Sequence, residues 1–330
     1  MAVTIAEITK LRKLSGAGLA DCKKALTESE GDIEKAMEII RKKGQAVAAK
    51  RSDRDASEGC VLVKSAGDFA IILALKCETD FVANNADFVA LTQSIIDAAV
   101  ANNCKSIEEV LALPMGNGTI QDAITERSGI TGEKMELDGF CRVEGAYINT
   151  YNHMKKNILC TMVAFNKVAD EKVAHDVAMQ IAAMNPIAID QDRVPQEVKD
   201  REFAVAVDKT KAEQVQKAVE AALKKAGFNL YTAESEEHLN EGIMKGYITE
   251  AQADEIRKLK AEVAEQKAAN MPAQMVENIA KGRLAKFFKE VCLLEQQDTI
   301  QSDKNVAQVL KEADPELKVI DFKRFTLRAE

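Results

Sequence analysis

An acidic residue and a large aromatic ring stand side by side at a polar turn, within residues 77–85. The turn follows an apolar run, Ala70–Leu75, expected to be a buried strand, and precedes an amphipathic segment, Phe88–Val100, expected to be a helix. Phe81 beside Asp80 therefore has two interpretations. The ring can fold back into its own core, or it can protrude as a wedge that a partner receives, because exposed apolar groups beside charges mark recognition sites.

The other side chains that could carry chemistry are scattered along the chain. The seven cysteines are widely spaced and form no Cys-x-x-Cys pair, which fits reduced thiols better than a disulfide framework or a zinc site. The three histidines, His153, His175 and His238, are too far apart for a convincing metal cluster. No spacing supports a thiol catalyst that pairs Cys77 or Cys160 with a histidine. We therefore expect no metal site and no catalytic residue.

The sequence also lacks the motifs by which proteins hold nucleotides. No Gly-x-x-x-x-Gly-Lys-Ser/Thr occurs, so the chain is not expected to bind a nucleoside triphosphate through a phosphate-binding loop. Gly16 and Gly18 lack both the third glycine and the preceding strand of a dinucleotide-binding fold. These observations predict a binding protein that performs no covalent chemistry and needs no cofactor.

Composition narrows the class of partner. The 330 residues suffice for two or three domains, and 46% of them are hydrophobic. The formal net charge of −8 argues against a general nucleic-acid binder, which needs a basic surface to displace counterions. The first residues show no basic stretch followed by an apolar one, so we expect no secretion signal, and no apolar run approaches the roughly 20 residues that span a bilayer. We expect a cytoplasmic protein that binds another protein, and neither nucleic acid directly nor a membrane.

The elements that position these residues begin with a helical module over residues 1–44. Thr4 and Glu7 form a capping box, which predicts a first helix whose apolar face includes Ile5. A third helix is expected to end at Gly44, since glycine is a preferred C-cap residue. Three short helices with so small a core favour a docking module over a catalytic one.

Two related blocks of strand, strand and helix follow, and they predict an α+β fold with two antiparallel core subdomains. Residues 45–57, polar and partly basic, are interpreted as a solvated linker; the alternative is a contact with an acidic partner surface. The first subdomain is expected at residues 58–138 and the second at 139–330. In the second block we expect a strand over Phe140–Tyr151 and another over Asn157–Phe165.

A long charged helical stretch, residues 195–285, interrupts the second subdomain. Two apolar stripes with heptad-like spacing can pair there as an antiparallel coiled-coil hairpin. The stripes consist of Val215, Val219, Ala222 and Leu223 on one helix, and of Ile256, Leu259 and Val263 on the other.

Several separated motifs, in the same order, resemble bacterial elongation factor Ts. They are residues 4–44, the turn Thr79–Asn84, Tyr151–His153, His175–Pro186, Gly282–Phe287 and Asp303–Glu312. Members of that family are nucleotide exchange factors for the translational GTPase elongation factor Tu. The resemblance therefore implies that this chain binds elongation factor Tu with its GDP and promotes GDP release, so that GTP can load.

The resemblance also implies roles for individual residues. Asp80 and Phe81 would enter elongation factor Tu as a wedge that disrupts its Mg²⁺ and nucleotide site, with Thr79 and Val82 beside them. His153 matches a second intruding side chain, although the family usually has small residues and an arginine where this chain has Met154-Lys-Lys-Asn. The N-terminal module, which in the family resembles a ubiquitin-associated domain, would dock on the GTP-binding domain. Residues matching the family there are Arg12, Gly16, Gly18, Asp21 and Lys23.

Two questions stay open at the level of the sequence. The hairpin is longer than in the family by an extension over residues 204–266, which is either a longer coiled coil without a new partner or a site for dimerisation or a third protein. A homodimer, or a complex with two copies of each protein, through this hairpin is one expectation. The rival function is an interaction adaptor, which would not require the turn Thr79–Asn84.

Overall fold

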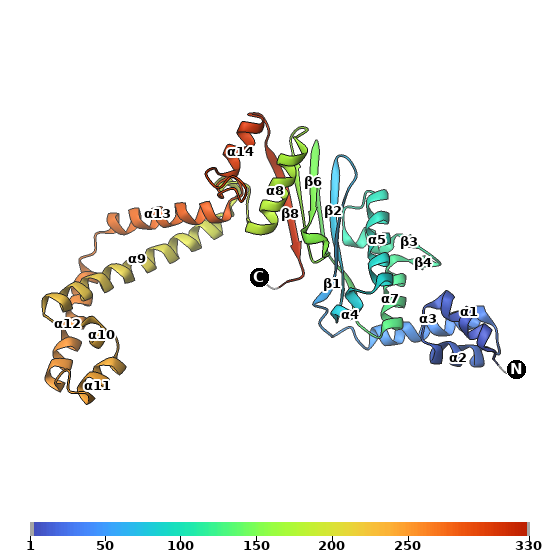
Figure 1. Cartoon of the computed structure of the whole chain (residues 1–330), viewed down its shortest axis with the longest axis horizontal. Coiled ribbons are helices and arrows are strands. Elements are labelled where there is room, and N and C mark those ends of the chain that lie inside the picture. Colours follow the sequence, from blue (N-terminus) through green and yellow to red (C-terminus); the bar gives the residue numbers. More distant parts are fainter. Residues whose placement is uncertain (1–2, 329–330) are drawn as a thin grey trace. The chain divides into compact units, whose positions relative to one another are not determined.

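The structure, a computed structural model, describes residues 3–328 and divides into two units (Figure 1). The first unit combines the chain up to Ile189 with the segment from Gln296 onward, and the second unit is Asp190–Glu295. Helices and small antiparallel sheets make up the first unit, whereas the second is helical. The chain as a whole therefore has a mixed α+β fold.

Three helices open the first unit and enclose a small core. Thr4 and Glu7 form the predicted capping box ahead of the first helix. The prediction that Ile5 faces the core is wrong, because its side chain is 83% exposed. The packed face begins one turn later, with Ile8 at its edge and Leu11 fully buried. The helices are α1 (Ile5–Ser15), α2 (Leu19–Glu28) and α3 (Ile33–Ala49).

The prediction that α3 ends at Gly44 is also wrong, because the helix continues to Ala49. Gly44 is buried where α3 crosses α7 (Ile120–Thr131). A Cβ atom on Gly129 of α7 would lie only 2.1 Å from the Cα atom of Gly44. The two glycines therefore let two helix backbones approach closely, and Gly44 has no capping role.

The first sheet has the strand order β1-β2-β5, with both pairs antiparallel. Its strands are β1 (Glu58–Ser65), β2 (Phe69–Cys77) and β5 (Met135–Glu144). One face packs against helices α5 (Ala86–Ala101), α6 (Ile107–Ala112) and α7. A two-stranded hairpin, β3 (Pro114–Met115) and β4 (Gly118–Thr119), precedes α7.

The second sheet has the order β6-β7-β8, also antiparallel, and α8 (Glu171–Met184) packs on β6 and β7. Its strands are β6 (Tyr147–Asn152), β7 (Leu159–Phe165) and β8 (Val319–Thr326), and α14 (Val306–Ala313) precedes β8. The single strand predicted over Phe140–Tyr151 is wrong. Its first part belongs to β5 and its second to β6, because pairing with β2 ends at Glu144 and pairing with β7 begins at Tyr147.

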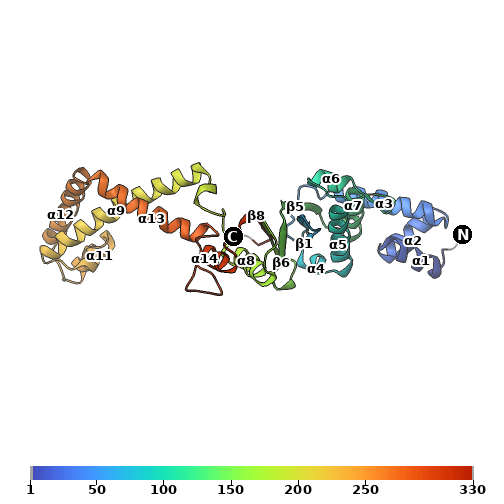
Figure 2. The ribbon, with the colours of Figure 1, turned by 90° about the horizontal axis from the view of Figure 1, so that it is seen from above.

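The two sheets share an apolar core, so the first unit has four layers: helices, sheet, sheet and helix (Figure 2). Strand β2 is buried on both faces because it lies between the first helical layer and the second sheet, and it is apolar along nearly its whole length for that reason. The residues between the sheets are Val61, Ala70, Ile72, Ala74, Val143, Cys160, Met162 and Ala164.

The second unit is built on one long helix, α9 (Gln196–Lys225), against which both α12 (Glu250–Ala269) and α13 (Ala273–Val291) pack. The two predicted stripes meet, since Val219 and Leu223 lie in one cluster with Ile256 and Leu259. The prediction of a simple two-helix hairpin is nevertheless incomplete. Two short helices, α10 (Leu230–Ala233) and α11 (Glu236–Met244), fold onto the end of the pair and add Ala233 and Leu239 to its core.

Candidate partner-binding site

The turn after β2 presents a bare aromatic ring. Thr79 caps the short helix α4 (Asp80–Ala83) by accepting a hydrogen bond from the Val82 amide at 3.4 Å. Val82 and Ala83 pack against the first sheet's core, whereas Phe81 on the opposite side is 85% exposed. The interpretation in which Phe81 folds back into its own core is therefore wrong. Asp80, also exposed, lies beside the ring.

The amphipathic segment after this turn is helix α5, as predicted, and its first residues fix the far end of the turn. Asn85 caps α5 by accepting from the Asp87 amide at 2.9 Å. The side chain of Asn84 donates to the Asp80 carbonyl at 2.8 Å. The exposed ring thus stands between two helix caps, which restrict the backbone on both sides of it.

Strong electrostatic contacts surround the start of the turn. The carboxylate of Glu78 accepts hydrogen bonds from the Lys134 amide at 2.6 Å and from the Arg51 and Arg54 guanidinium groups at 3.1 and 2.9 Å. Burial acts to raise the pKa of this carboxyl, but the Lys134 amide and the two guanidinium groups outweigh it and lower the pKa of Glu78 to about 2. Glu78 therefore stays ionised across the physiological range.

Arg51 and Arg54 correct the interpretation of residues 45–57 as a solvated linker. Residues 45–49 belong to helix α3, and Arg51 and Arg54 bind Glu78 of the same chain. The partly basic composition of this segment does not point to Glu78 as the partner, because the contact spans 27 residues for Arg51 and 24 for Arg54. Glu133, which also contacts the turn, carried no sequence signal.

The Cys77 thiol, next to the turn, is poorly reactive. Burial, reinforced by the nearby Glu133 carboxylate, raises the pKa of Cys77 to about 12. Burial likewise raises the pKa of Cys160 to about 12 and that of Cys60 to about 11. A thiolate nucleophile is therefore strongly disfavoured at these positions.

His153 lies on a separate turn, between β6 and β7, in the 3₁₀ segment His153–Lys155. Its Nδ1 atom is 3.2 Å from the Tyr151 hydroxyl, and the Tyr151 ring also meets His175 edge-on. Met154, which follows, has a positive φ of 54° and is exposed. A positive φ favours glycine and asparagine, so the backbone at this turn has a conformation that methionine seldom adopts.

The five N-terminal candidates fall into two kinds. Gly16 ends α1 in the left-handed region, with φ of 67°, so it has a structural role, whereas Gly18, at the N-cap of α2, has an ordinary φ of −62° and open space beside it. Asp21 forms an ion pair with Lys43, which links α2 to α3. Arg12 and Lys23 are exposed. Arg12 and Lys23 therefore present their charges to solvent, whereas the Asp21 carboxylate is shared with Lys43.

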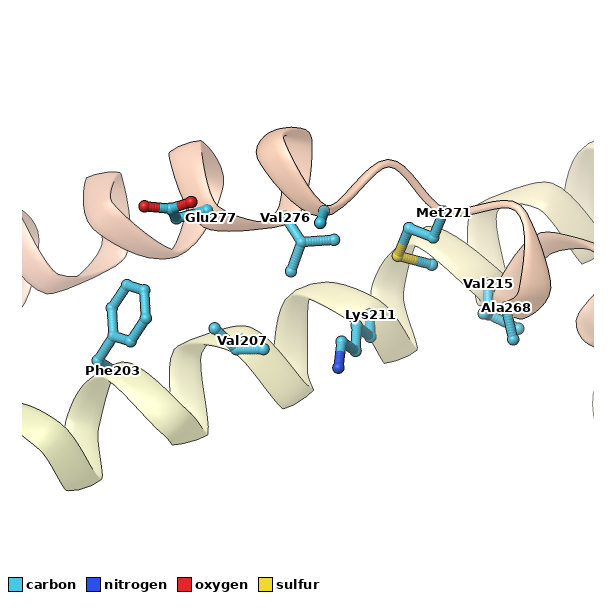
Figure 3. A pocket seen from close by; sticks show the side chains of 9 residues that line it. Phe203, Val207, Lys211, Val215, Ala268, Met271, Val276 and Glu277 are labelled. Carbon is cyan, nitrogen blue, oxygen red and sulfur yellow. The ribbon is translucent and has the colours of Figure 1, made fainter.

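The second unit has an apolar groove between α9 on one side and the end of α12 and the start of α13 on the other (Figure 3). Its volume is about 710 Å³. Figure 3 shows Phe203, Val207 and Val276 facing one another across it. Its lining residues are Phe203, Val207, Lys211, Val215, Ala268, Met271, Ala273, Val276 and Glu277.

Within residues 3–328, no cluster of three or more His, Cys, Asp and Glu side chains could hold a metal ion. Over the same described part of the chain, every helix is too short or too polar to cross a bilayer.

Comparison with known proteins identifies the family. The family model for elongation factor Ts matches residues 78–329, which include the exposed turn. The chain belongs to the elongation factor Ts family. Elongation factor Ts of Phocaeicola vulgatus is 69% identical and that of Parabacteroides distasonis 67% identical, and both matches cover all of both chains. Elongation factor Ts of Porphyromonas gingivalis is 44% identical over the same full extent. These family members therefore have counterparts of the second unit, including the extension at residues 204–266.

Proposed function

We propose that this protein, as a member of the elongation factor Ts family, acts in translation elongation by releasing GDP from elongation factor Tu. The observation that carries the proposal is the 85% exposed ring of Phe81 beside Asp80, on a turn capped at both ends. A protein does not leave so large an apolar side chain bare at a well-ordered turn without cost, and a partner that buries it recovers the hydrophobic free energy.

The mechanism follows from linkage. An exchange factor must bind the nucleotide-free GTPase more tightly than the GDP-bound form, and GDP must then weaken the binding of the factor by the same ratio. Phe81 would enter a gap in elongation factor Tu while Asp80 disturbs the groups that hold its Mg²⁺ ion. Burying one phenylalanine contributes roughly 1.5–3 kcal/mol, which is about one to two decades of affinity. Additional contacts are required for efficient exchange.

Those contacts would come from the N-terminal helices and from the second turn. Arg12 and Lys23, exposed on the N-terminal module, suit an acidic patch on the GTP-binding domain of the partner. His153 would enter a second position beside the nucleotide site. The protein would need no cofactor, since the Mg²⁺ and GDP belong to the partner, and it would work in the cytoplasm. Pairing of two copies through the second unit would give a dimer or a complex with two copies of each protein.

The test is the rate at which purified elongation factor Tu releases a fluorescent GDP analogue with a substoichiometric amount of this protein. Wild type should accelerate release and turn over repeatedly. Phe81→Ala should reduce the accelerated rate by about tenfold or more, because it removes the ring that the partner would bury. Tyr247→Ala is the matched control, since Tyr247 is an exposed aromatic residue of the second unit.

Equal release rates for wild type and Phe81→Ala would show that the ring is not the wedge. If the wild-type protein does not accelerate release at all, although folded and mixed with its own species' elongation factor Tu, the exchange function is wrong and the adaptor function becomes the better explanation.

A further inference from the structure

One carboxylate holds the start of the exposed turn from a distant part of the chain. Glu133, in the segment between α7 and β5, accepts hydrogen bonds from the amides of Glu78 and Thr79 at 3.2 and 3.1 Å. Its other oxygen accepts from the Thr79 hydroxyl at 2.6 Å. Hydrogen bonds to a carboxylate are stronger than those between neutral groups, and this carboxylate accepts three of them from two consecutive residues.

The contact is reciprocal. The carboxylate of Glu78 accepts from the amide of Lys134, the residue after Glu133, at 2.6 Å. Each of the two chain segments thus donates backbone amide protons to a carboxylate of the other. The arrangement resembles a capping box formed across the fold, and it fixes the end of β2 against the segment that leads into β5.

The same helix that leads to Glu133 also holds the far end of the turn. Arg127 of α7 donates to the side-chain oxygen of Asn85, the cap of α5, at 2.9 Å, and it forms an ion pair with Asp87 at 3.1 Å. Residues 79–85 are therefore held at both ends, by Glu133 just after α7 at the start and by Arg127 of α7 at the far end. Phe81 lies between these two attachments, and its side chain takes part in neither.

We propose that Glu133 is a positioning residue for nucleotide exchange, because it fixes the Thr79–Asn85 turn so that Phe81 points outward before the partner arrives. The inference rests on the exchange function proposed above. A turn that is ordered in advance loses less conformational entropy when its ring is buried, and this lowers the cost of forming the productive complex. Without Glu133 the turn would lose its attachment at Glu78 and Thr79, this end would become ordered only on binding, and the ring would enter the partner more slowly.

The first test compares Glu133→Ala and Glu133→Gln with Glu136→Ala in the GDP-release assay. Glu136 is a matched control, since it is a nearby carboxylate that pairs with Lys76 and Lys134 and not with the turn. Glu133→Ala should lower the release rate at saturating concentration by about tenfold, the order expected when charge-assisted hydrogen bonds are lost. Glu133→Gln, which keeps one acceptor oxygen and the side-chain shape, should lose less, and Glu136→Ala should behave as wild type.

A second test separates positioning from general damage. In a Phe81→Ala background, Glu133→Ala should have little further effect on release, since the two residues act through one ring. Amide hydrogen exchange over residues 80–83 should become faster in Glu133→Ala, while exchange in α8 stays unchanged. The positioning role is refuted if the two changes reduce the release rate by factors that multiply in the double variant. It is also refuted if a folded Glu133 variant promotes GDP release at the wild-type maximal rate.

The outcomes also separate this inference from the proposed function. If Phe81→Ala impairs release and neither Glu133 variant does, the exchange function stands and the positioning role fails. If wild type itself does not accelerate release, the exchange function fails and the positioning role fails with it, while hydrogen exchange still reports whether Glu133 orders the turn. Should Glu133→Ala fold poorly in far-UV circular dichroism, Glu133→Gln carries the comparison alone.

Discussion

Adding one methyl group at Gly129 should force the N-terminal helices away from α7, whereas adding one at Gly44 should not. A Cβ atom added at Gly129 would lie 2.1 Å from the Gly44 Cα atom and 2.9 and 3.0 Å from the Gly44 carbonyl carbon and oxygen. Carbon atoms in contact need about 3.5 Å, so the two backbones would have to separate by roughly 1.4 Å. Backbone atoms cannot rotate out of the way as a side chain can.

The reverse substitution supplies the control. A Cβ atom on Gly44 would lie 3.4 Å from the Gly129 Cα atom, which is close to an ordinary contact. Both glycines are inside helices, so each change to alanine gains about 1 kcal/mol of helix propensity. Overpacking costs about 1–3 kcal/mol. Gly129→Ala should therefore be less stable than Gly44→Ala by about 1–3 kcal/mol, and the difference isolates the steric cost because the propensity gain cancels.

Native-state hydrogen exchange of the α3 amides measures this directly, since it reports the free energy with which α3 opens. Gly129→Ala should speed exchange in α3 relative to Gly44→Ala, and a protease should cut faster within residues 50–57. Equal opening free energies in the two variants would show that α3 and α7 do not approach as closely as the structure has them. Close approach of α7 would then no longer explain why Gly44 lies inside α3 and not at its end.

Three further predictions concern titration, reactivity and the second unit. The pKa of Glu78 in the folded protein, about 2, is below its ordinary value of 4.5. The ionised carboxylate therefore stabilises the fold fully above pH 4.5, and this contribution is lost as the pH falls toward 2. In Glu78→Gln, the free energy of unfolding measured with urea should depend less on pH across that window. Cys77 and Cys160, whose pKa values burial raises to about 12, should react with a thiol reagent at pH 8 about 10³-fold more slowly in the native protein than in urea, and fast labelling would contradict their burial. Leu239→Ala should destabilise the second unit by about 2–5 kcal/mol, since Leu239 is fully buried in that unit's small core; the change should speed hydrogen exchange in α11 and α12 but not in β2.

The sequence by itself determined the features that depend on neighbouring residues. The capping box of Thr4 and Glu7 satisfies backbone amides within one helical turn, so it forms wherever that helix lies. The short, continuous apolar run Ala70–Leu75 indicates a buried strand, and the amphipathic spacing of Phe88–Val100 indicates a helix, because run length and side-chain periodicity are local properties of the sequence. The ordered motifs likewise sufficed to indicate the family.

Only the tertiary structure decided which way these elements face and what holds them. Gly44 resembles a C-cap in sequence, but the helix continues past it because α7 approaches there with a second glycine. Phe140–Tyr151 is continuously strand-like, but its two ends pair with strands of different sheets. The exposed Phe81 lies on a turn that Glu133 contacts at Thr79, across 54 residues of chain. Contacts of that separation leave no periodic trace in the sequence, because their partners are brought together only by packing of the whole unit.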